Sequence, residues 1–272
     1  MPEGPEIRRA ADAIAAAIAH QPLQDVFFAF DHLKPYADAL QGDRIYAVET
    51  HGKAMLIRFE NQLNIYSHNQ LYGKWFIRKA QSFPTTNRQL RLAIHTVNKS
   101  ALLYSASDIA VLPNELLLTH PFLSRLGPDV LHPEITTDEV LARLQDRRFA
   151  RRQLAVLLLD QGFLCGLGNY LRSEVLFVAG VRPTRRPVDC EVAQLAKLAA
   201  GAIALSQQSY QTGGLTNDLT QVAQLKAQGW RRSHYRHYVF GRGGQPCFTC
   251  GTPIVKEVAA GRRCYYCPTC QQ

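Results

Sequence analysis

The 272-residue sequence predicts an α+β protein, with an N-terminal helix plus an antiparallel β-sandwich, then a helical region, then a small cysteine-rich module. Three observations support this class. An apolar helical stripe opens the chain and is followed by short strands with turn residues between them. Longer helical patterns take over after residue 131, and five of the seven cysteines fall in the last 26 residues. The sequence therefore predicts domains at 1–131, 132–235 and 236–272.

The first helix is expected from Pro5 to Ala19, with its apolar stripe at Ile7, Ala11, Ile14 and Ile18. Carboxylates at Glu3 and Glu6 suit the positive end of the helix dipole, and Pro5 suits the first turn. A second interpretation concerns chemistry. If the initiator Met1 is removed, Pro2 carries an N-terminal secondary amine, which is a nucleophile. The opening "MPEGPEI" by itself is compatible with both.

Three strand pairs are expected in the first domain. "RIYAVET" and "KAMLIRFE" are joined at His51-Gly52, with Lys53 at the turn, where a lysine is usually only solvated. "RQLRLAIHT" and "SALLYSA" flank "VNK". "QLNIYSH" and "KWFIRKA" flank "NQLYG" and predict a hairpin whose tip holds Gln70, Leu71 and Tyr72. An exposed Leu-Tyr tip suits a wedge that unstacks a duplex, whereas a tip folded back onto the sheet is the structural alternative.

The helical region begins at a capping threonine, Thr136 or Thr137, ahead of two carboxylates. Helices are predicted over "RRQLAVLLLDQ", "YLRSEVLFVAG" and "EVAQLAKLAAGAIALSQQS", and "QTGGLTNDLTQVAQLKAQGW" is predicted as a mobile loop or weak helix. The glycine-bearing "GFLCGLGN" places Asn169 at the mouth of a helix. Such a turn can bind a phosphate through its amides, or it can be a tight structural turn.

The cysteine pairs "CFTC" and "CPTC" predict one structural Zn²⁺ held by Cys247, Cys250, Cys267 and Cys270. Cys264 and Cys267 have the same spacing, so the spacing alone also permits Cys264 in place of Cys270. A redox function is disfavoured because no thioredoxin-like pattern surrounds either pair. Cys165 and Cys190 are expected to be buried or idle thiols.

The net charge is +9, and the excess is confined to two stretches, 147–186 and 231–272, each with a net charge of +6. Nucleic acid is the natural partner of such a surface, and a basic face kept for solubility is the alternative. The sequence contains no apolar run long enough to span a bilayer and no secretory signal. Cytoplasmic residence is therefore expected.

Six short motifs occur in order along the chain: "PEGPEI", "HGKA", "SHNQLYG", "PFLSRLGPDVL", "GLGNYLRSE" and "GRRCYYCPTCQ". Together they resemble the formamidopyrimidine-DNA glycosylase and endonuclease VIII family, with 182–235 matching least clearly. The resemblance implies a helix-two-turn-helix domain, a zinc-finger hairpin and action on damaged duplex DNA as a monomer. It implies no organic cofactor.

The resemblance also implies roles for individual residues. Pro2 would form a Schiff base with the sugar, with Glu3 as its acid/base partner, Glu6 close by and Lys53 as the essential lysine. Arg262 would hold the phosphate beside the lesion. Cys267 and Cys270 would complete the zinc site, leaving Cys264 spare. The implied DNA contacts are Gln70, Leu71, Tyr72, Arg125 and Asn169.

The implied reaction is base excision followed by β,δ-elimination of the strand. An α-amine has a reference pKa of about 7.7–8.0, so part of it is neutral at physiological pH. A nearby cation such as Lys53 would favour the neutral form further. The "QLY" set implies oxidised pyrimidines as substrates. Two alternatives stay open: an oxidised-purine enzyme of the same family, and a non-catalytic zinc-finger DNA-binding protein.

Overall fold

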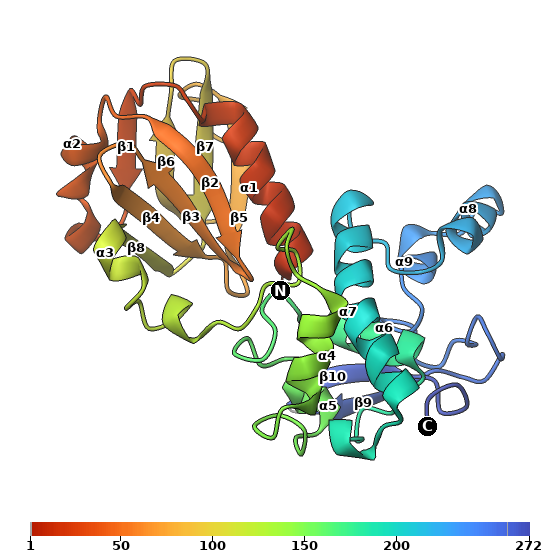
Figure 1. Ribbon diagram of the computed structural model, residues 1–272. Helices are drawn as coiled ribbons and strands as arrows, with labels where there is room; N and C mark the ends of the chain where they lie inside the picture. Colours follow the sequence, from red (N-terminus) through yellow and green to blue (C-terminus); the bar gives the residue numbers. More distant parts are fainter. Residues whose placement is uncertain (1, 260) are drawn as a thin grey trace. The chain divides into compact units, whose positions relative to one another are not determined.

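The computed structural model describes residues 2–259 and 261–272, and the chain forms two compact units, Met1–Arg125 and Leu126–Gln272 (Figure 1). The first unit contains a β-sandwich with a helix at its start, and the second contains helices and a two-stranded sheet. The predicted α+β class is confirmed. Among the described residues, no helix combines the length and the apolar character that crossing a bilayer demands.

The sandwich has two four-stranded sheets, in the orders β2-β3-β4-β8 and β1-β6-β7-β5, and all neighbouring strands are antiparallel. The strands are β1 (Asp25–Phe28), β2 (Ile45–His51), β3 (Ala54–Phe59), β4 (Leu63–His68), β5 (Lys74–Lys79), β6 (Leu90–His95), β7 (Lys99–Tyr104) and β8 (Asp108–Pro113). The helices of this unit are α1 (Gly4–Ile18), α2 (Tyr36–Leu40) and α3 (Asn114–Leu117), with short 3-10 turns at Asp31–Leu33 and Leu123–Arg125.

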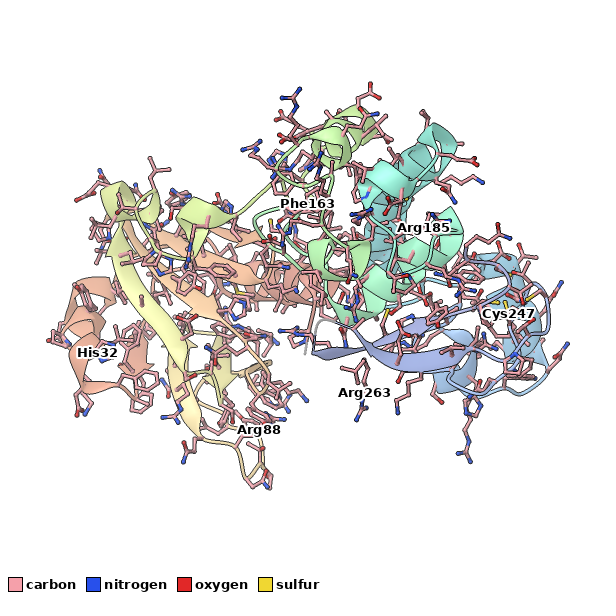
Figure 2. The ribbon with its side chains drawn as sticks, turned by 90° about the horizontal axis from the view of Figure 1, so that it is seen from below. His32, Arg88, Phe163, Arg185, Cys247 and Arg263 are labelled. Atoms are coloured by element: carbon pink, nitrogen blue, oxygen red, sulfur yellow. The ribbon has the colours of Figure 1, made fainter. Side chains whose placement is uncertain are left out.

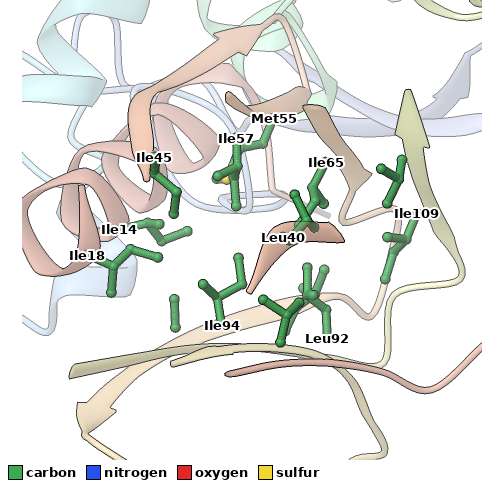
Figure 3. Close-up of a cluster of buried hydrophobic side chains, with 14 of the residues drawn as sticks. Ile14, Ile18, Leu40, Ile45, Met55, Ile57, Ile65, Leu92, Ile94 and Ile109 are labelled. Carbon is green, nitrogen blue, oxygen red and sulfur yellow. The ribbon is translucent and has the colours of Figure 1, made fainter. Parts of the chain in front are cut away.

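The core of this unit lies between the two sheets and under α1 (Figure 3). Ile57 and Ile65 enter it from one sheet, and Leu92 and Ile94 enter it from the other. All four apolar residues of the predicted α1 stripe are buried, at Ile7, Ala11, Ile14 and Ile18. The helical spacing of four small and branched side chains therefore places α1 on the sandwich.

Two of the three predicted hairpins are confirmed, since β2 pairs with β3 and β6 pairs with β7. The third prediction is wrong. β4 pairs with β3 and β8, whereas β5 pairs with β7, so the segment from 69 to 73 crosses from one sheet to the other. Both strands bury residues in one core, and closing a sandwich requires the chain to change sheets somewhere. The alternating pattern cannot distinguish such a crossing from a hairpin.

The second unit has its core between α6 (Asn169–Ala179) and α7 (Val192–Gln211), with α4 (Thr137–Gln145) packed on α7. Its other elements are α5 (Leu154–Leu157), a 3-10 turn at Pro187–Asp189, α8 (Leu219–Ala227), α9 (Arg232–Tyr235), β9 (Val255–Ala259) and β10 (Arg262–Tyr266). The strands β9 and β10 form an antiparallel pair. Thr136 caps α4 by accepting a hydrogen bond from the Glu139 N–H at 3.1 Å, as the sequence predicted.

One local prediction in this unit differs from the structure, and the structure decides between the two alternatives of another. The helix expected over "RRQLAVLLLDQ" is reduced to the four residues of α5, because Asp160 turns the chain by accepting the Gly162 N–H at 2.8 Å. The stretch expected to be a mobile loop or weak helix contains α8. Asp218 caps this helix at the Gln221 N–H, and its apolar side chains Val222 and Leu225 pack against Tyr235.

Candidate active site and zinc centre

The start of α1 presents the residues of the predicted amine chemistry. Glu3 is the N-cap residue and is only 2% exposed, and Pro2 beside it is half-buried. The Glu3 N–H donates to Glu6 Oε2 at 2.9 Å, and Glu6 Oε1 accepts from Arg9 at 3.1 Å. Glu6 is thus bound to the helix terminus itself. Met1, whose removal would expose the Pro2 amine, lies outside the described residues.

Lys53 lies at the turn between β2 and β3, after Gly52, whose φ of +59° suits glycine. Its side chain is 5% exposed, so the expectation of a solvated lysine is wrong. β3 begins at Ala54, which pairs with His68 at the end of β4. Burial lowers the pKa of the His68 imidazole, and the positive charge of Lys53 lowers it further. A buried cation at this end of the sheet requires partners of opposite charge or polarity.

The predicted wedge residues lie in the 69–73 loop that joins β4 to β5. Leu71 is 57% exposed and Tyr72 is 67% exposed, so neither side chain is folded back onto a sheet. Gln70 has a φ of +48°, the left-handed conformation, and its Oε1 accepts from Ser107 Oγ at 2.8 Å. Arg88 donates to the Tyr72 carbonyl at 2.5 Å. The loop displays two large apolar side chains on a backbone held from several sides.

In the second unit, Asn169 is the first residue of α6, after a glycine-bearing turn. This turn closes around Gln161, whose Nε2 donates to the carbonyls of Leu159 and Leu167 and whose Oε1 accepts from the Gly166 N–H. The turn is therefore tightly bonded internally, as the structural interpretation expects. The helix terminus that follows it still presents Asn169 with the positive end of the dipole.

A fully buried arginine, Arg172, connects this helix to the terminal hairpin. One of its nitrogens donates to the Ala155 and Ala259 carbonyls, at 2.8 and 3.1 Å. The other donates to Asn169 Oδ1 at 3.1 Å and to the Arg263 carbonyl at 2.9 Å. Ala259 is the last residue of β9 and Arg263 is the second residue of β10, so one guanidinium holds both strands of the hairpin next to Arg262. Sequence reasoning missed this residue, because its only signal was a charged residue in the middle of an apolar helix.

The terminal module brings the four predicted cysteines together. The Sγ atoms of Cys247, Cys250, Cys267 and Cys270 all lie within 4.8 Å of one another, with 3.9 Å between Cys247 and Cys270 and 3.4 Å between Cys250 and Cys267. Four thiolates around one Zn²⁺ at about 2.3 Å would be about 3.8 Å apart, so the cluster fits the metal. Figure 2 shows Cys247 in this cluster and Arg263 on the hairpin. The predicted structural zinc is confirmed by this donor set.

Two further contacts explain why the fifth cysteine is excluded from the cluster. Cys264 is fully buried, and its Sγ lies 3.9 Å from Ser173 Oγ on α6. The Cys270 N–H instead points at Cys267 Sγ, at 3.4 Å, an amide-to-thiolate contact that suits a zinc knuckle. The alternation of side chains along β10 therefore directs Cys264 towards the helix.

The remaining predicted DNA contacts are exposed. Arg262 begins β10 and is exposed, next to the exposed Arg263. Arg125 closes the first unit and its Nε donates to the Pro121 carbonyl at 2.6 Å. In the first unit, the structure thus brings Glu3 next to Glu6 and places Lys53 near the end of β4. In the second unit, it connects Asn169 to the hairpin that contains Arg262.

A second buried residue that sequence reasoning missed is Glu174. Its carboxylate accepts the N–H groups of Tyr238, Val239 and Phe240, at 2.7 to 2.9 Å, and the Thr216 hydroxyl at 2.6 Å. Burial raises the pKa of this carboxyl, and the hydrogen bonds oppose that effect. This cluster ties α6 to the segment that leads into the zinc module.

Three family models match successive parts of the chain. Residues 1–107 match the formamidopyrimidine-DNA glycosylase N-terminal domain, and residues 126–220 match the H2TH domain of the same enzymes. Residues 244–272 match the zinc finger found in FPG and IleRS. The order of the three agrees with the order of motifs in the sequence.

Full-length relatives agree with the models. Endonuclease 8 of Escherichia coli (strain K12 / DH10B) is 49% identical over 271 residues, and that of Shigella sonnei (strain Ss046) is 48% identical, each with 100% of both chains covered. Among solved structures, Lactococcus lactis formamidopyrimidine-DNA glycosylase bound to DNA with an abasic site has a TM-score of 0.81 at 20% identity, covering 99% of each chain. A complex of MutM with DNA containing carbocyclic 8-oxo-G has the same TM-score and identity, covering 100% of each chain. The chain therefore belongs to the formamidopyrimidine-DNA glycosylase and Endonuclease 8 family, as a DNA glycosylase and abasic-site lyase.

Proposed function

We propose that the chain removes oxidised pyrimidines from duplex DNA and then cuts the strand at the abasic site through a Schiff base on Pro2. The observation that carries this proposal is the Pro2–Glu3 pair at the start of α1, in a chain 49% identical to Endonuclease 8 from end to end. The 69–73 loop, with Leu71 and Tyr72 exposed, supports insertion into a duplex.

The residues supply each step of this chemistry. The Pro2 nitrogen attacks the sugar C1′, the bond from C1′ to the base breaks, and the base leaves with a proton that Glu3 can deliver. Ring opening gives an iminium, which makes the proton on C2′ acidic. Loss of that proton expels the 3′ phosphate, and a second elimination expels the 5′ phosphate. Burial of Glu3 keeps bulk water from competing with these transfers.

Other residues would position the DNA and tune the amine. Lys53 is a buried cation in the same unit as Pro2, and a positive field favours a neutral amine. Asn169 and Arg262 would bind phosphates near the damaged nucleotide, and Arg125 would bind a further phosphate. The zinc is structural and holds the module that carries Arg262.

We also infer the organisation of these parts. Residues 1–131 would form the catalytic domain, 132–235 the DNA-binding helical domain and 236–272 the zinc finger. Action as a monomer in the cytoplasm, associated with the nucleoid through DNA, is the expectation from the family. Sedimentation of the free protein and of its DNA complex tests the monomer.

The decisive experiment is borohydride trapping on duplex DNA that contains one abasic site. Protein whose first residue is verified as Pro2 should give a covalent complex, and protein that retains Met1 should give none, because its Pro2 nitrogen is an amide. Absence of trapping with the Pro2 form would favour a non-catalytic DNA-binding protein. Comparing excision of thymine glycol with excision of 8-oxoguanine then tests the substrate class, and a preference for 8-oxoguanine would favour the oxidised-purine alternative.

A further inference from the structure

The backbone of the 69–73 loop contains a conformation that its sequence disfavours. Gln70 has a φ of +48°, which a side chain with a Cβ adopts at an energetic cost. The loop is also tightly closed, since the Gly73 N–H donates to the Asn69 carbonyl at 2.7 Å. A Cβ at Gly73 would lie 2.6 Å from that same oxygen. Contacts from outside the loop must therefore stabilise this shape.

Two such contacts converge on Gln70. Its backbone N–H donates to His68 Nδ1 at 3.1 Å, and its side-chain Oε1 accepts from Ser107 Oγ at 2.8 Å. The first contact fixes the strained residue itself, because the amide belongs to the backbone whose φ is positive. The loop held in this way displays Leu71 and Tyr72 to solvent.

His68 is a rigid support for this bond. It is the last residue of β4, where its backbone pairs with Ala54 on one side and Asp108 on the other. Its ring and the Phe122 ring pack edge to face, with 5.2 Å between centroids. The charged groups that face it are Asp108 and Lys53. Because Nδ1 accepts the Gln70 N–H, the neutral ring carries its proton on Nε2.

We propose that His68 is a positioning residue for base excision, and that its neutral Nδ1 holds the 69–73 loop in the conformation that enters the duplex. This inference rests on the proposed function, in which the loop replaces a base leaving the stack. A damaged base that is still paired must be unstacked before excision. An abasic site has no base to unstack, so His68 should matter for excision and little for strand cleavage at an abasic site.

The test uses two substitutions at His68 and one matched control. His68→Phe keeps a ring and removes the acceptor, whereas His68→Asn places an amide oxygen near the position of Nδ1. His132→Phe removes a bond of the same kind, from the Glu134 N–H to His132 Nδ1 at 3.3 Å, in an exposed loop of the second unit. Single-turnover rates are measured on a thymine glycol duplex and on an abasic-site duplex.

His68→Phe should lower the excision rate about 3- to 10-fold, the effect of one lost hydrogen bond, with less than a twofold change in abasic-site cleavage. His68→Asn should restore most of the excision rate, and His132→Phe should change neither rate. Equal loss of both rates in His68→Phe and His68→Asn would overturn the proposal, since it would point to a ring contact with DNA or to folding. Failure of abasic-site cleavage in the unsubstituted protein would instead overturn the proposed function.

The pH dependence gives a second readout. Burial and Lys53 lower the pKa of His68 below its ordinary value of 6.5, and Asp108 opposes them. A protonated ring cannot accept the Gln70 N–H, so in the unsubstituted protein the ratio of excision to abasic-site cleavage should fall only as the pH drops through this lowered pKa, which lies below 6.5. In His68→Asn the ratio should stay flat over that range. An equal fall in the Asn variant would contradict the role of Nδ1.

Discussion

The guanidinium of Arg172 donates a hydrogen bond to Asn169 Oδ1 at 3.1 Å while its other nitrogen binds the Ala259 carbonyl. A residue at the start of α6 and a strand of the zinc hairpin therefore share one fully buried cation. Because the carbonyl of Arg263 is bound as well, the orientation of the start of β10, where Arg262 lies, depends on this side chain.

Arg172→Met should destabilise the second unit by about 3 kcal/mol, because buried carbonyls lose a charged donor. It should also weaken binding to abasic-site DNA about tenfold, since both Asn169 and Arg262 lose a fixed position. Chemical unfolding and DNA titration measure the two effects. Arg44→Met removes an exposed charge from the first unit and serves as the control. Unchanged DNA binding in a folded Arg172→Met protein would contradict the positioning role.

Removal of the zinc should unfold the terminal hairpin and leave the sandwich folded. The module has a small core, so the metal supplies much of its folding energy. Chelation, or Cys247→Ser, should abolish DNA binding while the first unit keeps its unfolding transition. Cys190→Ser, outside the cluster, should retain one zinc per chain. Elemental analysis measures the zinc content, and calorimetry measures the unfolding transitions. Intact DNA binding without zinc would contradict the prediction.

Truncating the exposed apolar pair, Leu71→Ala with Tyr72→Ala, should lower excision of thymine glycol on the order of 10-fold, because unstacking loses its wedge. The stability should change by less than about 0.5 kcal/mol, since both side chains are largely exposed. Leu118→Ala is the matched control, because Leu118 is 85% exposed elsewhere in the same unit. If Leu118→Ala lowers excision of thymine glycol by the same factor, the loss does not depend on the 69–73 loop and the wedge role is contradicted.

The stability of the second unit should depend on pH through His237. Burial, with Arg236 and Arg232, lowers the pKa of this imidazole well below 6.5. The Thr216 hydroxyl donates to Glu174, so its oxygen accepts from His237 Nδ1 at 2.7 Å, and the ring is neutral. The unfolded chain therefore binds more protons just below pH 6.5, and the free energy of unfolding falls there as the pH is lowered.

The fall should approach about 1.4 kcal/mol per pH unit and level off below the folded pKa. His237→Asn can still donate to Thr216 but does not titrate, so its profile should lack this slope. The difference between the two profiles separates His237 from Glu174, whose pKa is shifted in the opposite direction. Urea unfolding at several pH values measures both profiles, and identical slopes would contradict the assignment.

Local patterns in the sequence were sufficient to predict several elements of the fold. The apolar stripe of α1, the two short-turn hairpins and the cap at Thr136 each depend on residues close together in the chain. The existence of a zinc site was predictable for the same reason, because each cysteine pair lies within one turn, whereas the spacing left Cys264 and Cys270 as alternatives for the fourth ligand. The roles of Pro2, Glu3, Lys53 and Arg262 came from ordered motifs and stay predictions.

Other features required contacts between distant residues. The sequence pattern predicts a hairpin at 69–73, where the chain crosses between sheets, because two consecutive strands of a sandwich have the same pattern whether or not they share a sheet. The roles of Arg172 and Glu174 could not be read from the neighbouring sequence, since each has partners more than 40 residues away, such as Arg263 for Arg172 and Thr216 for Glu174.

The sequence by itself therefore determined the α+β class, the zinc ligands Cys247, Cys250 and Cys267, and the order of motifs that indicates a DNA lyase. Only the tertiary structure decided which sheet each strand joins, which side of β10 faces α6 and what holds Gln70 in its left-handed conformation. The physical reason is that periodicity and capping are local, whereas a buried charge or a strained loop is stabilised by groups that only folding brings within hydrogen-bonding distance.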